Sequence, residues 1–130
     1  MENIEINEYV RTKDGVIAQF THIETYYKDK IYWFDNTIYQ DYEENISYLR
    51  DNNLEKYIKK HSFNIIDLIE VGDLVQIHDR GNRIYQVDRD YQGKLAIIDV
   101  DWNEYEELYN EDIKSIVTRE MMESVEYRIE

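Results

Sequence analysis

The 130-residue chain contains no cysteine and no proline, four isolated glycines, and no run of 18 apolar residues. The absence of cysteine excludes disulfide bonds, thiolate zinc sites and cysteine nucleophiles. Isolated glycines also exclude a glycine-rich phosphate-binding loop. Because a long apolar run and a basic-then-apolar start are both missing, the sequence predicts no transmembrane helix, no signal peptide and no membrane partner.

Positive charge is scarce as well. The chain has 15 Lys and Arg against 29 Asp and Glu, so its formal net charge is −14 at pH 7. Binding to a phosphate backbone needs a basic surface, and we therefore expect no direct contact with nucleic acid. Hydrophobic residues still make up 42% of the chain, enough to form a folded core.

Residues that favour strands dominate what is present. The chain has 18 isoleucines and 13 tyrosines but two alanines, a composition that supports β-sheet better than long helices. Asp14-Gly15 is the strongest hairpin-turn signal. Strands are predicted at residues 8–13, 16–24, 31–34, 57–61, 73–78, 83–88, 94–100, 113–117 and 125–129.

Helical signals are few and short. Asp41 and Glu44 resemble a capping box before apolar residues at helical spacing, which predicts a helix over residues 41–53. Residues 62–69 are expected to form a helical turn or connector. Thr118 can cap a further short helix that runs to residue 123.

The two halves share one pattern of strand, glycine turn, strand, charged turn and strand, then a polar insert and a short last strand. Gly72-Asp73-Leu74-Val75 at the start of the second meander is typical of SH3-like barrels. We therefore predict a mainly β (α+β) protein of two tandem SH3-like small barrels with short helical inserts. The units are residues 1–61, with the helical insert 41–53, and residues 62–130, with an acidic loop at 99–112. A single irregular α+β sheet is the alternative.

Three stretches, at residues 7–15, 60–73 and 112–118, resemble a group of small, mostly uncharacterised proteins of Gram-positive bacteriophages and prophages. The resemblance covers roughly a quarter of the chain and implies phage origin. Frequent Ile, Tyr, Asn and Lys with few Gly, Ala and Pro agree with a low-GC genome. The resemblance implies no catalytic residues.

The acidic stretch at 99–112 is the first candidate site. Its carboxylates alternate with aromatic side chains, so it could imitate a row of phosphates in a basic groove, with glutamates facing solvent. A solvated loop that only aids solubility is the alternative. The candidate partner-binding residues are Asp99, Asp101, Trp102, Glu104, Tyr105, Glu106, Glu107, Glu111 and Asp112.

A calcium loop is another interpretation of this stretch. Asp99, Asp101 and Asn103 match the first, third and fifth positions of an EF-hand loop. However, Glu104 stands where glycine is needed and Asn110 where a bidentate glutamate belongs. The sequence therefore does not favour calcium, and we expect no metal.

The second candidate site is the basic cluster of the second half. Guanidinium and aromatic groups together can hold a nucleotide by charge-assisted hydrogen bonds and stacking. Ordinary ion pairing with the surplus acids is the alternative. The residues are Arg80, Arg83, Tyr85, Arg89 and Tyr91.

Signals for catalysis are weak. His22, His61 and His78 have no metal-ligand spacing, and His22 shares a predicted strand face with Phe20, as a core or interface histidine would. Four serines lack a nucleophile context. We therefore predict no enzyme and no cofactor.

These patterns favour a small non-enzymatic phage accessory protein in the host cytoplasm. The specific hypothesis is inhibition of a host defence complex that binds nucleic acid, in an anti-CRISPR or anti-restriction manner, through a host protein's basic groove. The alternatives are a sponge for a nucleotide immune signal and a protein-interaction adaptor.

Overall fold

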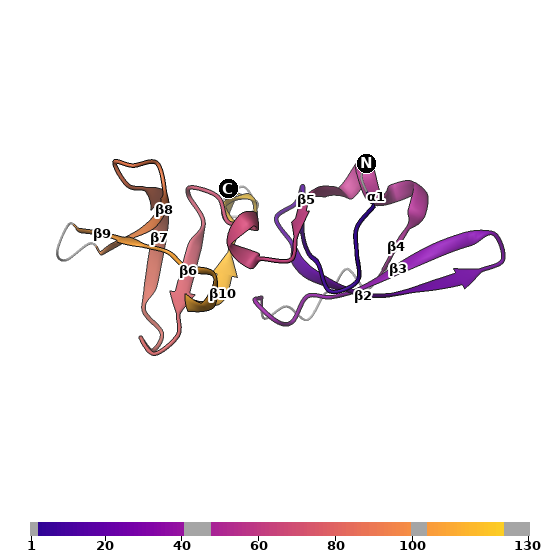
Figure 1. Cartoon of the computed structure of the whole chain (residues 1–130), viewed down its shortest axis with the longest axis horizontal. Coiled ribbons are helices and arrows are strands. Elements are labelled where there is room, and N and C mark those ends of the chain that lie inside the picture. Colours follow the sequence, from indigo (N-terminus) through magenta and orange to yellow (C-terminus); the bar gives the residue numbers. More distant parts are fainter. Residues whose placement is uncertain (1–2, 41–47, 100–103, 124–130) are drawn as a thin grey trace. The chain divides into compact units, whose positions relative to one another are not determined.

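The computed structural model describes residues 3–40, 48–99 and 104–123, and the chain divides into unit 1, Met1–Leu68, and unit 2, Ile69–Glu130 (Figure 1). Each unit contains one five-stranded antiparallel sheet and little helix. The predicted mainly β class is therefore confirmed. Most predicted strands are present, with ends within two residues of those expected.

Unit 1 is a four-strand meander whose fifth strand returns to pair with the first, in the order β4-β3-β2-β1-β5. Short helical turns precede and follow the fifth strand. The elements are β1 Tyr9–Thr12, β2 Ile17–Tyr26, β3 Asp29–Asp35, β4 Tyr48–Arg50, η1 Asp51–Asn53, α1 Leu54–Tyr57, β5 Ile58–Ser62 and η2 Ile65–Leu68.

The last turn, η2, explains where unit 1 ends. The sequence predicts a boundary between residues 61 and 62, whereas the units divide between 68 and 69. Arg11 of β1 is fully buried and its guanidinium Nη1 donates a hydrogen bond of 2.9 Å to the carbonyl oxygen of Leu68. A buried guanidinium without hydrogen-bond partners would be costly, so this bond is favoured. It connects η2 to the first sheet and places η2 in unit 1.

The predicted helix at 41–53 is wrong over residues 48–50, which form β4. In β4, Tyr48 lies opposite Trp33 of β3, with ring centroids 5.3 Å apart. Such aromatic pairs contribute about 0.5–1.5 kcal/mol, which is comparable to or larger than the differences in helix propensity between ordinary residues, up to about 0.7 kcal/mol. The residues that follow β4, 51–57, are helical, and residues 41–47 lie outside the described part of the chain.

Unit 2 has the same arrangement, in the order β10-β6-β7-β8-β9. Residues 119–123 are helical after Thr118, as predicted, and the predicted strand 125–129 lies outside the described residues. The elements are β6 Leu74–Ile77, β7 Ile84–Arg89, β8 Leu95–Asp99, β9 Glu104–Glu107, η3 Asn110–Asp112 and β10 Ile113–Val117.

The two units therefore share one topology: four strands in a meander, a short helical segment that begins with a 3-10 turn, and a fifth strand beside the first. In each described sheet the fourth and fifth strands are opposite edges. No strand pairing among the described residues closes either sheet into a barrel. The repeat of topology supports the tandem organisation, while the strands that the structure describes form open sheets and not closed barrels.

A carboxylate fixes the start of the meander in unit 2. Asp73, fully buried, accepts hydrogen bonds from the backbone N–H groups of Glu70 (2.8 Å) and Arg119 (2.9 Å). Gly72 precedes it with φ +96°, a conformation that glycine adopts without strain. The Gly72 N–H donates to the carbonyl of Val87, and the Val87 N–H donates to that of Asp73. This carboxylate joins β6 to the residues that follow β10.

Unit 1 repeats this turn with different residues. Glu8 accepts the backbone N–H of Glu5 at 2.7 Å, and Asn7 precedes it with φ +78°. The Asn7 N–H donates to Phe20, and Phe20 donates back to Glu8. The Glu8 carboxylate also lies 3.1 Å from Nδ1 of His61 on β5. The same carboxylate device therefore joins the first and last strands of both units.

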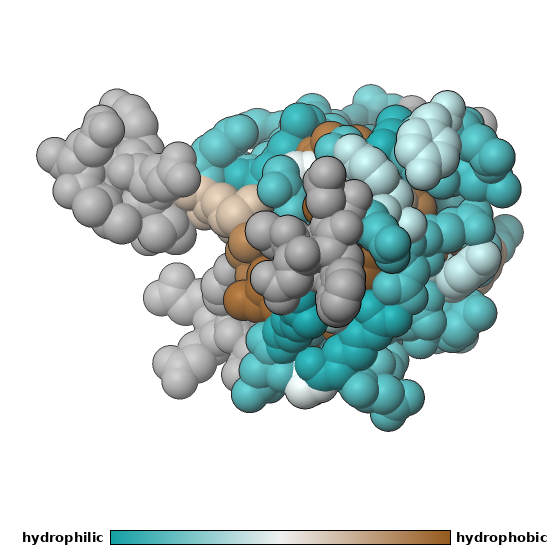
Figure 2. Space-filling view, turned by 90° about the vertical axis from the view of Figure 1, so that its left-hand side faces the viewer, coloured by the Kyte–Doolittle hydropathy of each residue, from teal (hydrophilic) through white to brown (hydrophobic). Residues whose placement is uncertain are grey.

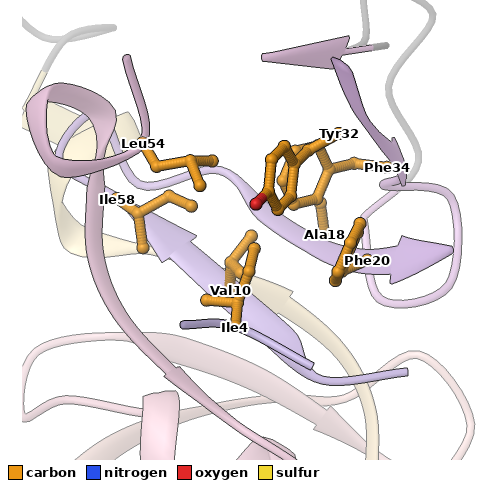
Figure 3. Close-up of a cluster of buried hydrophobic side chains, with 8 residues drawn as sticks. All are labelled: Ile4, Val10, Ala18, Phe20, Tyr32, Phe34, Leu54 and Ile58. Atoms are coloured by element: carbon orange, nitrogen blue, oxygen red, sulfur yellow. The ribbon is translucent and has the colours of Figure 1, made fainter. Parts of the chain in front are cut away.

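The core of unit 1 lies on one face of its sheet (Figure 3). Phe20 is fully buried, and its ring lies 5.1 Å from that of Tyr32 and 5.7 Å from that of Phe34. Burial of each large apolar side chain contributes about 1.5–3 kcal/mol. The cluster consists of Ile4, Val10, Ala18, Phe20, Tyr32, Phe34, Leu54 and Ile58.

The core of unit 2 is built from alternate residues of its strands. Val75 pairs with Tyr85, and Val87 pairs with Ile97, so these four side chains share one face of the sheet. All are buried. Residues between them in sequence point to the other face, called the outer face below. Other buried apolar residues of unit 2 are Ile77, Ala96, Leu108, Ile113 and Ile116.

Candidate functional site

The acidic stretch is not a loop over its whole length. Residues 104–107 form β9, an edge strand that pairs with β8, and residues 110–112 form η3. Charged side chains on an edge strand discourage pairing with other chains, which gives these carboxylates a structural use. Figure 2 shows the molecule from the side on which β8 and β9 lie, and this surface is mostly hydrophilic with smaller hydrophobic areas.

Glu106 is engaged in an ion pair and not free to imitate a phosphate. Its two carboxylate oxygens accept hydrogen bonds from Nη1 (2.8 Å) and Nη2 (2.5 Å) of Arg80, a bidentate arrangement. The hydrogen bond to Glu106 is the main cause that raises the pKa of Arg80. The predicted row of four solvent-facing glutamates therefore loses one member.

Glu107 is also occupied within unit 2. Its carboxylate accepts a hydrogen bond of 2.7 Å from the hydroxyl of Tyr109 and lies 3.6 Å from Nζ of Lys94. The hydrogen bond to Glu107 raises the pKa of Tyr109, because ionised tyrosine could not donate it. Two of the four predicted mimic glutamates thus have cationic partners.

Glu104 and Glu111 remain exposed, and neither has an ion-pair partner among the described residues. Asp112 accepts the backbone N–H of Tyr109 at 3.2 Å and thereby caps η3. Asp99 ends β8 opposite Glu104. The predicted site residues Asp101 and Trp102 lie outside the described residues.

Tyrosine rings accompany these carboxylates. Tyr105 of β9 is 42% exposed, and its ring lies edge-on to that of Tyr91 at 6.1 Å between centroids. Tyr109, in the turn that follows β9, is also exposed. Exposed tyrosines beside carboxylates offer both contact area and charge to a cationic partner.

The predicted arginine–tyrosine site for a nucleotide is not available in the fold as the sequence suggested. Tyr85 is 4% exposed, so its ring cannot stack on a nucleotide base. The guanidinium carbons of Arg80 and Arg83 lie 5.6 and 5.4 Å from the centroid of the Tyr85 ring, so the ring already makes cation–π contacts with two arginines. Arg89 donates to the carbonyl of Gly93 at 2.7 Å. The face predicted to bind a nucleotide is the core-facing side of β7.

Sequence reasoning missed a pocket on the outer face of unit 2, with a volume of about 180 Å³. Ile84, 58% exposed, forms one side of it. Ile84, an isoleucine at a solvent-facing strand position, could have indicated an apolar outer surface. Because both faces of β6 and β7 carry apolar residues, the sequence does not show which face is the core. The lining residues are Leu74, Val75, Gln76, Ile84, Ser115 and Val117.

Of the two predicted roles for His22, core or interface, the structure excludes the core. The register shifts between Phe20 and His22, where the hydroxyl of Thr21 donates to the carbonyl of Trp33. This bulge turns His22 to the solvent-facing side, where its side chain is 53% exposed and stacks on Trp33 at 5.9 Å.

Within the described residues, no group of three or more His, Asp or Glu side chains could hold a metal ion. In the same part of the chain, no helix is long and apolar enough to cross a membrane. No model of a known protein family, no curated protein and no solved structure matches the chain.

Proposed function

We propose that the protein acts by binding and not by catalysis, with unit 2 recognising a basic surface on a partner protein. In this proposal both units are SH3-like modules, an assignment supported by the meander, the 3-10 turn and the fifth strand that returns to the first. The phage resemblance of the sequence makes a cytoplasmic host defence complex that binds nucleic acid the partner class.

The uneven distribution of charge carries this proposal. Unit 2 contains 16 acidic against seven basic residues, whereas unit 1 contains 13 against eight. The excess of negative charge is therefore larger in the unit that presents Glu104 and Glu111, which have no ion-pair partner within the described parts of the chain. Complementary charge of this kind steers association and selects partners more than it adds affinity.

The structure narrows how the acidic surface would work. Because Glu106 and Glu107 are paired internally, the surface offers separated carboxylates beside Tyr105 and Tyr109. Tyrosines at the centre of an interface usually carry more binding energy than rim carboxylates. The proposal is therefore an acidic–aromatic protein interface and not a row of phosphate mimics.

The test expresses the chain in a low-GC Gram-positive host that carries a CRISPR or restriction system and measures phage plating. Wild type should restore plating, and the double variant Glu104→Lys/Glu111→Lys should not. The matched control is Glu24→Lys/Asp29→Lys, which changes net charge equally on the β2–β3 hairpin of unit 1. It should restore plating as wild type does.

A binding measurement with the purified defence complex accompanies this test. Affinity should fall steeply between about 0.1 M and about 1 M salt, where the Debye length shrinks from roughly 10 to 3 Å. Equal plating by wild type and Glu104→Lys/Glu111→Lys, or binding that does not respond to salt, would exclude the acidic surface as the interface.

A further inference from the structure

One cross-strand row of side chains runs over the whole outer face of unit 2. Val117 pairs with Leu74, Leu74 with Gln86, Gln86 with Ile98, and Ile98 with Tyr105. The row therefore visits all five strands, from β10 at one edge to β9 at the other. Its two ends, Val117 and Tyr105, are each 42% exposed.

The β10–β6–β7 end of this row contains the apolar pocket. Its polar lining is already satisfied, because the hydroxyl of Ser115 donates to Gln76 at 2.7 Å and the Gln76 amide donates to the carbonyl of Asn82 at 3.1 Å. The pocket therefore presents mainly the apolar side chains of Ile84 and Val117 to a ligand. At about 180 Å³ the pocket suits one apolar side chain, since a dry cavity of roughly 150 Å³ binds benzene.

The β9 end of the row has different chemistry. Tyr105 and Tyr91 present exposed rings in edge contact, whereas Glu107, on the same face as Tyr105, is already bonded to Tyr109 and Lys94. Asp88 shares the next cross-strand row with Glu107, and Asp88 has no ion-pair partner in the described part of the chain. Aromatic rings beside carboxylates attract a guanidinium or ammonium group.

We propose that this outer face binds an extended basic segment of the partner protein, with an aliphatic side chain in the pocket and an arginine or lysine at Tyr105. The inference rests on the proposed function and specifies the partner's chemistry. The distance across the sheet from β6 to β9 is three strand spacings, about 14 Å. An extended chain advances roughly 3.3 Å per residue, so the apolar and basic residues lie about four positions apart.

Fluorescence anisotropy with the full chain tests this. The probe is a labelled ten-residue peptide with one leucine and one arginine four positions apart. Matched peptides replace leucine by serine, replace arginine by glutamine, or place the two side by side. The first peptide should bind, and each matched peptide should bind at least fivefold more weakly. Equal binding of all four would overturn the proposal.

Protein variants locate the binding. Ile84→Ser should weaken binding at least tenfold and Tyr105→Ala about threefold to tenfold. Ile23→Ser removes an exposed isoleucine of unit 1 and should leave binding unchanged. If Ile84→Ser instead changes the sedimentation of the chain alone, a second copy occupies the face and the peptide proposal is wrong.

The peptide assay contains no defence complex, so the two proposals fail separately. If the chain binds the peptide specifically but does not restore phage plating, a defence complex is excluded as the partner. Peptide binding by the outer face would remain supported. If the wild-type chain does not bind the peptide and Ile84→Ser restores phage plating as well as wild type does, the outer face is excluded as a binding site. The acidic interface of the proposed function would remain supported.

Discussion

Replacement of Asp73 by alanine should destabilise unit 2 more than any change on its charged surface. The Asp73 carboxylate is fully buried and accepts two backbone N–H groups, those of Glu70 and Arg119. A hydrogen bond to a charged group contributes about 1.5–3 kcal/mol, and a buried donor left without a partner costs a similar amount. Because the two N–H groups gain partial access to water, we expect a loss of about 3–5 kcal/mol.

Two variants bracket this estimate. Asp73→Asn keeps one acceptor oxygen and should lose about half as much stability as Asp73→Ala. Glu111→Ala removes the same charge from an exposed position that has no ion-pair partner in residues 3–40, 48–99 and 104–123, and it should change stability by at most about 0.5 kcal/mol.

Urea unfolding gives the free energies, and hydrogen exchange of β6 amides reports on unit 2 separately. The reasoning fails if Asp73→Ala unfolds within about 0.5 kcal/mol of Glu111→Ala, a difference typical of ordinary surface substitutions. In that case the repeated turn would be a consequence of strand pairing and not a cause of it.

Three further outcomes can be checked. Phe20→Ala should cost about 3–5 kcal/mol by urea unfolding, because it empties a fully buried aromatic site; a loss below about 1 kcal/mol would contradict the assigned core. Arg80→Ala should cost at most about 1 kcal/mol, since its bond to Glu106 is largely exposed; a much larger loss would show that the pair organises the sheet. Burial and a hydrogen bond with Tyr9 raise the pKa of Tyr39 to about 12, so its contribution to stability is lost as pH rises from about 10 to 12. A carbon-detected NMR titration should show one late tyrosine that Tyr39→Phe removes; its persistence in that variant would refute the assignment.

Strand positions followed from the sequence because local signals specify them. Turn residues such as Asp14-Gly15 and alternating β-branched side chains locate the hairpins without knowledge of long-range contacts. Residues 48–50 were missed because their strand depends on pairing of Tyr48 with Trp33, a contact that helical periodicity cannot reveal. The bulge at Thr21 similarly displaced His22 from its expected face.

The candidate sites were harder to predict because they depend on pairing across the sheet. Glu106 and Arg80 are 26 residues apart, and their bond appears only when the edge strand β9 is in place. The sequence places Tyr85 among candidate stacking residues, whereas the fold buries its ring. The pocket combines residues of three strands, so no local segment contains its pattern.

Zero-length carbodiimide crosslinking of the chain to the proposed defence complex tests the central claim most directly, because it joins a carboxylate only to a lysine in contact with it. We expect crosslinks from Glu104 or Glu111 to partner lysines, and their loss at high salt. Crosslinks confined to carboxylates of unit 1, such as Glu24 and Asp29, would contradict the claim that unit 2 is the binding unit.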